Sequence, residues 1–91
     1  MNNFFIIKEL VKEKRKGQES VDLNVVGVYR SFGRATKKLL NYIDKFSNKL
    51  TDTNFCYNKS NKTCVFVAKM NMEEKEDIIN VYISIEKCKS V

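Results

Sequence analysis

The sequence contains no histidine, no proline and no tryptophan, and it has only three glycines among 91 residues. Without histidine, the chain lacks the commonest general base and the commonest metal-binding side chain. The absence of proline and the scarcity of glycine exclude collagen-like and loop-rich small scaffolds. These absences argue against an enzyme, and they predict that the protein uses no metal and no other cofactor.

Cysteine is also scarce: Cys56, Cys64 and Cys88 are an odd number at wide spacing, with no Cys-x-x-Cys pair. Such a set is a poor source of zinc ligands. Cys64 lies in an apolar alternation and is expected in the core, whereas a disulfide between strands stays open for the other two. This usage favours a reducing compartment, so we expect an intracellular location, either cytoplasmic or nuclear.

Long apolar runs are missing as well. The run Phe4–Ile7 is too short for the core of a secretion signal. No stretch approaches the ~20 apolar residues of a membrane span, so no membrane association is expected. The hydrophobic content of 43% still suffices to fold one domain over residues 1–91.

The net charge of +6 is unevenly distributed along the chain. Residues 1–49 carry eleven Lys or Arg against five Asp or Glu, whereas residues 50–91 carry six of each. A localised excess of positive charge attracts polyanions, chiefly nucleic acid or an anionic membrane face. The alternative is an ordinary solvated surface that favours solubility.

Apolar spacing predicts helices over residues 3–16 and 34–47. Gly17 is expected to end the first, and the basic residues before it would complement the helix dipole. The second is expected to start after the N-cap Ser31 and to carry separate apolar and basic stripes. The apolar stripe is expected to form core or a dimer interface.

Strands are predicted at residues 21–30, 54–57, 63–69 and 79–87. The first has apolar residues of both parities, which predicts a central strand covered on both faces, and its Gly27 indicates a bulge or a close approach. The order is α-β-α-β-β-β, or β-α-β-α-β-β if Phe4–Ile7 is extended. Either order predicts an α/β fold: a small two-layer sandwich with a mixed sheet of about four strands and two helices.

The segment from Val25 to Phe46 carries the most functional information. A strand ends at Arg30, a turn containing Gly33 follows, and a helix opens on basic residues. Together with the free N–H groups of a helix start, these side chains predict a site for phosphate backbones. The candidate nucleic-acid-binding residues are Arg30, Gly33, Arg34, Lys37, Lys38 and Lys45, with Lys12, Arg15 and Lys16 from the first predicted helix.

The run Gly33-Arg34-Ala35-Thr36-Lys37-Lys38-Leu39-Leu40, after a valine-rich strand, resembles the signature of the Alba superfamily. The strands predicted at 64–69 and 79–87 are similar to the β-hairpin that closes that fold. The resemblance covers about residues 18–89 and implies a two-layer α/β domain that dimerises and binds DNA or RNA. It also implies that Arg30 takes the place of the basic residue that ends the family's second strand.

The acidic segment 73–77 favours RNA over DNA, because its carboxylates would repel a duplex groove. Tyr29, Phe32 and Tyr42 are candidates for base stacking, although the core is the favoured place for them. We therefore expect a non-enzymatic, RNA-binding protein that acts as a homo- or heterodimer or within a ribonucleoprotein. The alternatives are a protein-interaction subunit that pairs through the helix at 34–47, and a small viral inhibitor of a host complex.

Overall fold

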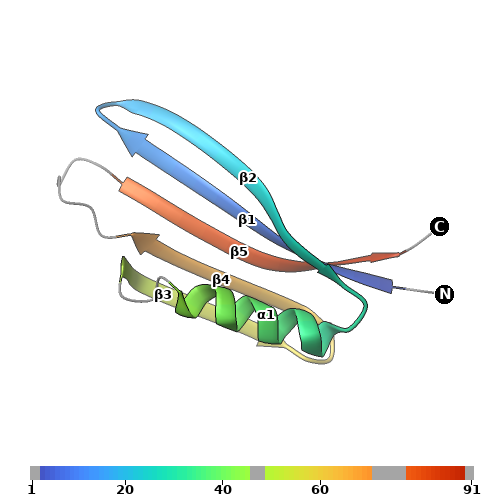
Figure 1. Ribbon diagram of the computed structural model, residues 1–91. Helices are drawn as coiled ribbons and strands as arrows, with labels where there is room; N and C mark the ends of the chain where they lie inside the picture. Colours follow the sequence, from blue (N-terminus) through green and yellow to red (C-terminus); the bar gives the residue numbers. More distant parts are fainter. Residues whose placement is uncertain (1–2, 46–48, 71–77, 90–91) are drawn as a thin grey trace.

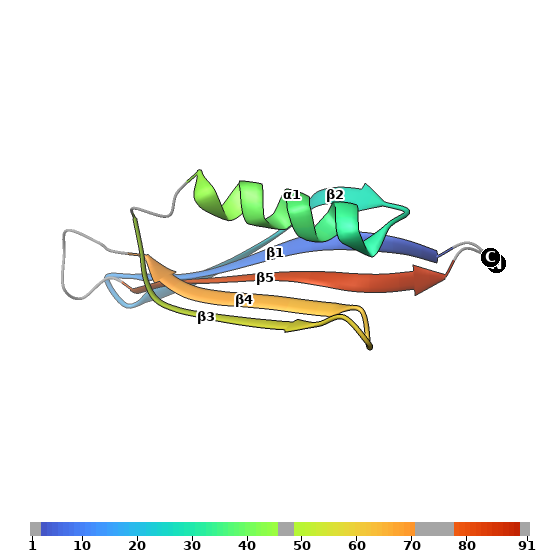
Figure 2. The same cartoon turned by 90° about the horizontal axis from the view of Figure 1, so that it is seen from below.

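The computed structural model describes residues 3–45, 49–70 and 78–89. The elements in chain order are β1 (Asn3–Arg15), β2 (Gln18–Tyr29), α1 (Phe32–Asp44), β3 (Leu50–Asn58), β4 (Thr63–Met70) and β5 (Ile78–Lys89). The strands form one antiparallel sheet in the order β2-β1-β5-β4-β3 (Figure 1). The helix lies across one face of this sheet, and no other described element covers the opposite face (Figure 2).

The predicted two-helix α/β sandwich with a mixed sheet of four strands is wrong. The sheet is antiparallel with five strands, and the described residues form one helix. The difference arises at residues 3–15, which form β1 instead of a helix. β1 pairs with β2 along one edge and with β5 along the other, so its side chains alternate between the face under α1 and the opposite face. Phe5 and Ile7 are buried under α1, while Phe4 and Ile6 are half-buried on the other face. Adjacent apolar pairs also produce the three- and four-residue spacings of a helix.

A two-residue turn at Lys16 and Gly17 joins β1 to β2. Both residues have positive φ, 49° and 82° respectively, as the type I′ hairpin turn requires. Arg15 and Gln18 pair directly on either side of it. Gly17, which was expected to end a helix, therefore lies at the tip of a β-hairpin.

β2 is an edge strand and not the central strand that its apolar residues suggested. A bulge opposite Ile7 and Lys8 adds Val26 to this strand, so the side-chain alternation changes phase there. The irregularity expected at Gly27 is confirmed, since a Cβ added there would lie 2.7 Å from the Tyr29 ring. Because of the phase change, four large side chains on both sides of the bulge face away from α1: Val21, Leu23, Val25 and Val28.

The core lies between α1 and the sheet. The helix contributes the buried Phe32, Ala35 and Leu39, which form its apolar stripe. The sheet contributes alternate residues of three strands: Phe5, Ile7, Cys64, Phe66, Ala68, Ile79, Val81, Ile83 and Ile85. The apolar stripe of the helix therefore forms core, so it is not available to pair with another chain.

Three of the predicted strands and the predicted burial of Cys64 agree with the structure. The predicted strands 63–69 and 79–87 correspond to β4 and β5, and 54–57 belongs to the longer β3. Burial of Cys64 is confirmed, and this burial raises the pKa of its thiol. The three cysteines are free thiols, so no disulfide links the strands.

Candidate nucleic-acid interface

The start of α1 is organised around Ser31. Its hydroxyl accepts a hydrogen bond from the Arg34 N–H at 3.4 Å, and its carbonyl accepts one from the Ala35 N–H at 3.0 Å. Ser31 is therefore the N-cap that the sequence predicts. The first turn contains no acidic residue, so the positive end of the helix dipole keeps its attraction for an external anion.

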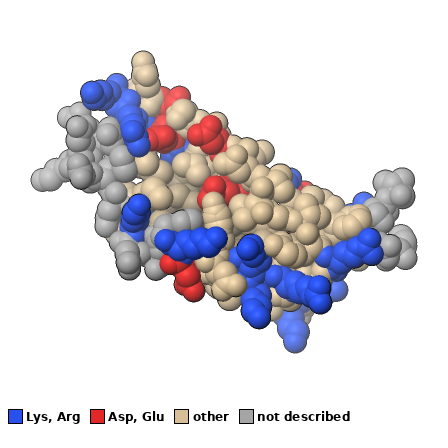
Figure 3. Space-filling model, viewed as in Figure 1, with Lys and Arg blue, Asp and Glu red and all other residues tan. Residues whose placement is uncertain are grey.

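The outer surface of α1 is basic. Lys and Arg side chains gather over the part of the molecule where this helix lies (Figure 3). Ion pairs between described residues join Lys8 to Glu86 and Arg15 to Glu13, and neither pair involves a cation of the helix. Six candidate residues are brought together here, all exposed, on the helix or just before it: Arg30, Gly33, Arg34, Lys37, Lys38 and Lys45.

A hollow of about 460 Å³ lies beside the first turn of α1. It brings the chain just before the helix together with the turn that joins β3 to β4. Three cations border it: Arg30 from the end of β2, and Lys59 and Lys62 from that turn. None of its lining residues is acidic; the others are Phe5, Ser31, Phe32, Gly33 and Tyr57. The hollow therefore joins concentrated positive charge to aromatic surface.

An aromatic row runs from the core to the surface at this hollow. The ring centroids of Phe5 and Phe32 are 5.7 Å apart, and those of Phe32 and Tyr57 are 5.6 Å apart at 21°. The row ends with Phe55, 6.5 Å from Tyr57 and nearly parallel to it at 8°. Tyr57 and Phe55 are 47% and 42% exposed, so aromatic surface is open to solvent at this end of the row.

Two of the cations lie close to aromatic rings. The Lys62 ammonium lies 5.9 Å from the centroid of Phe5, and the Arg30 guanidinium lies 5.9 Å from the centroid of Phe4. Such cation–π contacts hold a charge near the surface without neutralising it. Phe5 faces α1, so the Lys62 ammonium lies on the helix side of the sheet. Phe4 faces away from α1, so the Arg30 guanidinium lies towards the opposite face.

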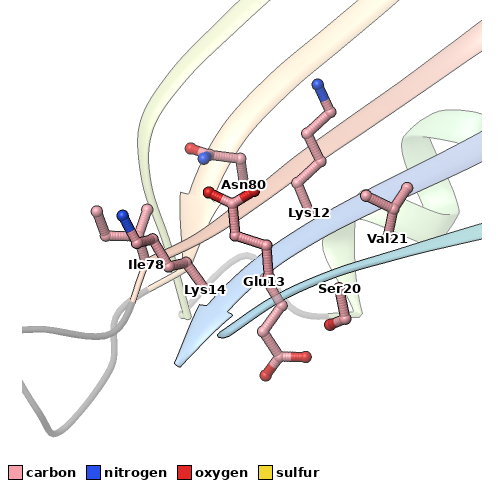
Figure 4. Close-up of a pocket in the computed structure, with 8 residues that line it drawn as sticks. Lys12, Glu13, Lys14, Ser20, Val21, Ile78 and Asn80 are labelled. Atoms are coloured by element: carbon pink, nitrogen blue, oxygen red, sulfur yellow. The ribbon is translucent and has the colours of Figure 1, made fainter. Parts of the chain in front are cut away.

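The remaining candidates, Lys12, Arg15 and Lys16, lie near the tip of the β1–β2 hairpin, far from the start of α1 (Figure 1). Arg15 pairs with Glu13, and the Lys12 ammonium lies 5.6 Å from the Tyr82 ring centroid. A second hollow at this end mixes both signs of charge (Figure 4); it is lined by Lys12, Glu13, Lys14, Glu19, Ser20, Val21, Ile78 and Asn80. The hairpin tip therefore does not extend the basic surface of α1.

Sequence reasoning missed the part of the interface that comes from the β3–β4 turn, because residues 58–62 look like an ordinary polar turn. The available signal was the placement of Phe55 and Tyr57 two residues apart, hence on one face of the strand, just before two lysines. The stacking candidates named from sequence have other roles. Phe32 belongs to the core, and the Tyr42 hydroxyl donates a hydrogen bond to the buried Glu9 at 2.7 Å.

Comparison of the chain with family models, with curated proteins and with solved structures finds no match. The described residues contain no group of three or more Cys, Asp or Glu side chains placed to hold a metal ion. In the same residues, no helix is long and apolar enough to cross a membrane. The acidic segment 73–77, on which the preference for RNA was based, lies outside the described residues.

Proposed function

We propose that this protein binds single-stranded nucleic acid, with RNA favoured over DNA, and that it performs no catalytic step. The observation that carries the proposal is the hollow at the start of α1. There Arg30, Lys59 and Lys62 line one hollow together with the exposed Tyr57, and none of the lining residues is acidic. Cationic grooves with aromatic platforms are the usual means of binding single strands without reading their sequence.

The backbone of the strand would follow the basic surface from this hollow along α1. Phosphates would contact Arg34 and Lys37 or Lys38 on successive turns of the helix and would leave the surface near Lys45. Long, exposed cationic side chains suit this role, because they neutralise phosphates and release counterions whatever the sequence. The likeness of residues 33–40 to the helix start of Alba proteins is a second, weaker support.

The bases would stack on Tyr57 and Phe55. These parallel rings are exposed on the face of the sheet that carries α1, so they lie on the same side as the cations of α1. A base in a duplex has both faces covered by its neighbours and is not available for such stacking. The aromatic row therefore favours single strands over duplexes.

The test is fluorescence anisotropy with a labelled single-stranded RNA across a series of salt concentrations. We expect binding that weakens with salt, and we expect Lys59→Gln/Lys62→Gln to flatten the logarithmic slope by about 1.4, since each phosphate contact on a single strand contributes ~0.7. The matched control is Lys12→Gln/Lys14→Gln at the hairpin tip, which removes the same charge and should leave the slope nearly unchanged. Single-stranded DNA and duplex RNA of the same sequence serve as comparisons, and both should bind more weakly.

Two results would overturn the proposal. One is the absence of salt-dependent binding to any single strand. The other is a slope that depends on Lys12 and Lys14 but not on Lys59 and Lys62, because nonspecific attraction by the overall charge would then explain the binding.

A further inference from the structure

The sheet face opposite α1 carries an extended apolar patch, although no described element covers it (Figure 2). Its most exposed side chains lie on β2: Val21, Leu23, Val25 and Val28 are each between 56% and 64% exposed. The pairing register places other apolar residues on this open face; they are Phe4, Ile6 and Leu10 on β1, Val65 and Val67 on β4, and Ile78 and Tyr82 on β5. Soluble monomers rarely leave so extended an apolar patch in water.

Two of the four described lysines on the open face, Lys8 and Lys14, are matched within the chain, whereas Lys12 and Lys69 have no carboxylate opposite them in the sheet. Glu86 forms an ion pair with Lys8, which raises the pKa of that lysine. Glu19 lies directly opposite Lys14 in the β1–β2 pairing. These two pairs need no partner of opposite charge, and the apolar patch beside them can pack against a copy of itself.

We infer that two copies of this chain pack through these open sheet faces, about a two-fold axis, to form a β-sandwich with one helix on each outer side. The area agrees with such a dimer. Five strands about 4.8 Å apart and 8 to 13 residues long cover roughly 650–1,050 Å² at ~3.4 Å per residue. A stable interface buries about 800 Å² on each partner.

The distribution of charge also suits this arrangement. The cations of α1 lie on the other side of the sheet, so packing through the open faces turns the two basic surfaces away from each other. Pairing through α1 would bring these like charges together, and it would have to displace a helix whose apolar stripe is already buried. The inference does not depend on the proposed nucleic-acid binding.

Sedimentation analysis of the purified protein tests the inference. We expect twice the chain mass of 10.6 kDa at ~100 µM, about a hundredfold above a Kd of ~1 µM. Leu23→Glu should dissociate the dimer, raising Kd at least about a hundredfold, because each copy would bury an unpaired carboxylate. The matched control is Leu40→Glu, which places the same charge on an exposed position of α1 and should leave the dimer intact.

Circular dichroism shows whether each variant is folded. If Leu23→Glu disturbs the fold, Val65→Glu takes its place, because Val65 is 42% exposed on β4 and faces the same side. A wild-type protein that sediments as a monomer at ~100 µM would overturn the inference. If Leu23→Glu or Val65→Glu is folded and still dimeric, the inference is also wrong, because the two copies would then pack through another surface.

Discussion

A hydrogen bond between Tyr42 and Glu9 links the helix to the sheet within the otherwise apolar layer between them. Glu9 is only 9% exposed on β1, and its carboxylate accepts a hydrogen bond of 2.7 Å from the Tyr42 hydroxyl on α1. Burial, followed by the bond to Glu9 and the negative charge of Glu9, raises the pKa of Tyr42 to about 12. A carboxylate this buried is costly without its donor, so the pair favours a single placement of the helix.

Replacing Tyr42 by phenylalanine should therefore lower the free energy of unfolding by about 1–3 kcal/mol at neutral pH. The difference in unfolding free energy between wild type and Tyr42→Phe should decrease as the pH rises. The folded pKa lies above the ordinary value of 10, so this stabilisation is complete below pH 10 and is lost as the pH rises towards 12. Urea unfolding at pH 7 and pH 11 measures it, and the gap between wild type and Tyr42→Phe should narrow at the higher pH.

The matched control is Tyr82→Phe, because no hydrogen bond in the described residues involves the Tyr82 hydroxyl. It should change stability little at either pH. Equal stability of Tyr42→Phe and wild type at pH 7 would contradict the stabilising role of this hydrogen bond. A gap that stays constant to pH 11 would contradict the raised pKa.

Among the elements, β1 shows where sequence reasoning fails. The helix predicted at 34–47 corresponds to α1, which begins two residues earlier; residues 46 and 47 lie outside the described residues. The prediction succeeded because separate apolar and basic stripes at helical spacing have no strand equivalent. The apolar residues of 3–16 fit both the three- and four-residue spacing of a helix and the two-residue alternation of a strand. Only the pairing of β1 with β2 and β5 decides between the two. The pairing of β1 with β5 joins the two ends of the chain, so no local pattern contains it.

In the candidate site, too, the residues close together in sequence were predicted and those brought together by the fold were missed. Arg30 and the cations of α1 are contiguous in sequence, so their meeting could be predicted from one strand-turn-helix segment. Lys59 and Lys62 reach the same hollow only because the helix carries the chain from β2 to β3, at opposite edges of the sheet. The hairpin cations were misplaced with the element that carries them, since β1 points away from the start of α1 (Figure 1).

Replacing glycine by alanine should have opposite effects on stability in the β1–β2 turn and in the helix. Gly17 has φ +82°, and a Cβ added there would meet no heavy atom within 4 Å, so Gly17→Ala should cost about 1 kcal/mol through backbone strain alone. Gly33 lies in the first turn of α1, where an added Cβ would meet only the Ser31 hydroxyl at an ordinary 3.6 Å. Gly33→Ala should therefore stabilise the protein by up to about 1 kcal/mol. Thermal unfolding of the two variants measures both effects, and shifts of the same sign would contradict these backbone assignments.

The whole molecule has two chemically distinct sides, a basic one that carries α1 and an apolar one without a cover among the described elements (Figures 2 and 3). If the apolar sides of two copies join, the basic sides point in opposite directions. Their separation is then set by the thickness of two chains, each 19 Å in its shortest dimension. One short oligonucleotide cannot reach both surfaces, so the dimer should hold two separate strands.

This arrangement predicts that the protein brings two strands together. A mixture of donor- and acceptor-labelled RNA oligonucleotides should show energy transfer when wild-type protein is added, with a stoichiometry of one strand per chain. Leu23→Glu should still bind each strand, because its basic side is unchanged, but it should give no transfer. Loss of binding in Lys59→Gln/Lys62→Gln would remove the transfer for a different reason, which anisotropy distinguishes. Energy transfer that persists in a monomeric Leu23→Glu variant would contradict the two-sided arrangement, because one chain would then hold both strands.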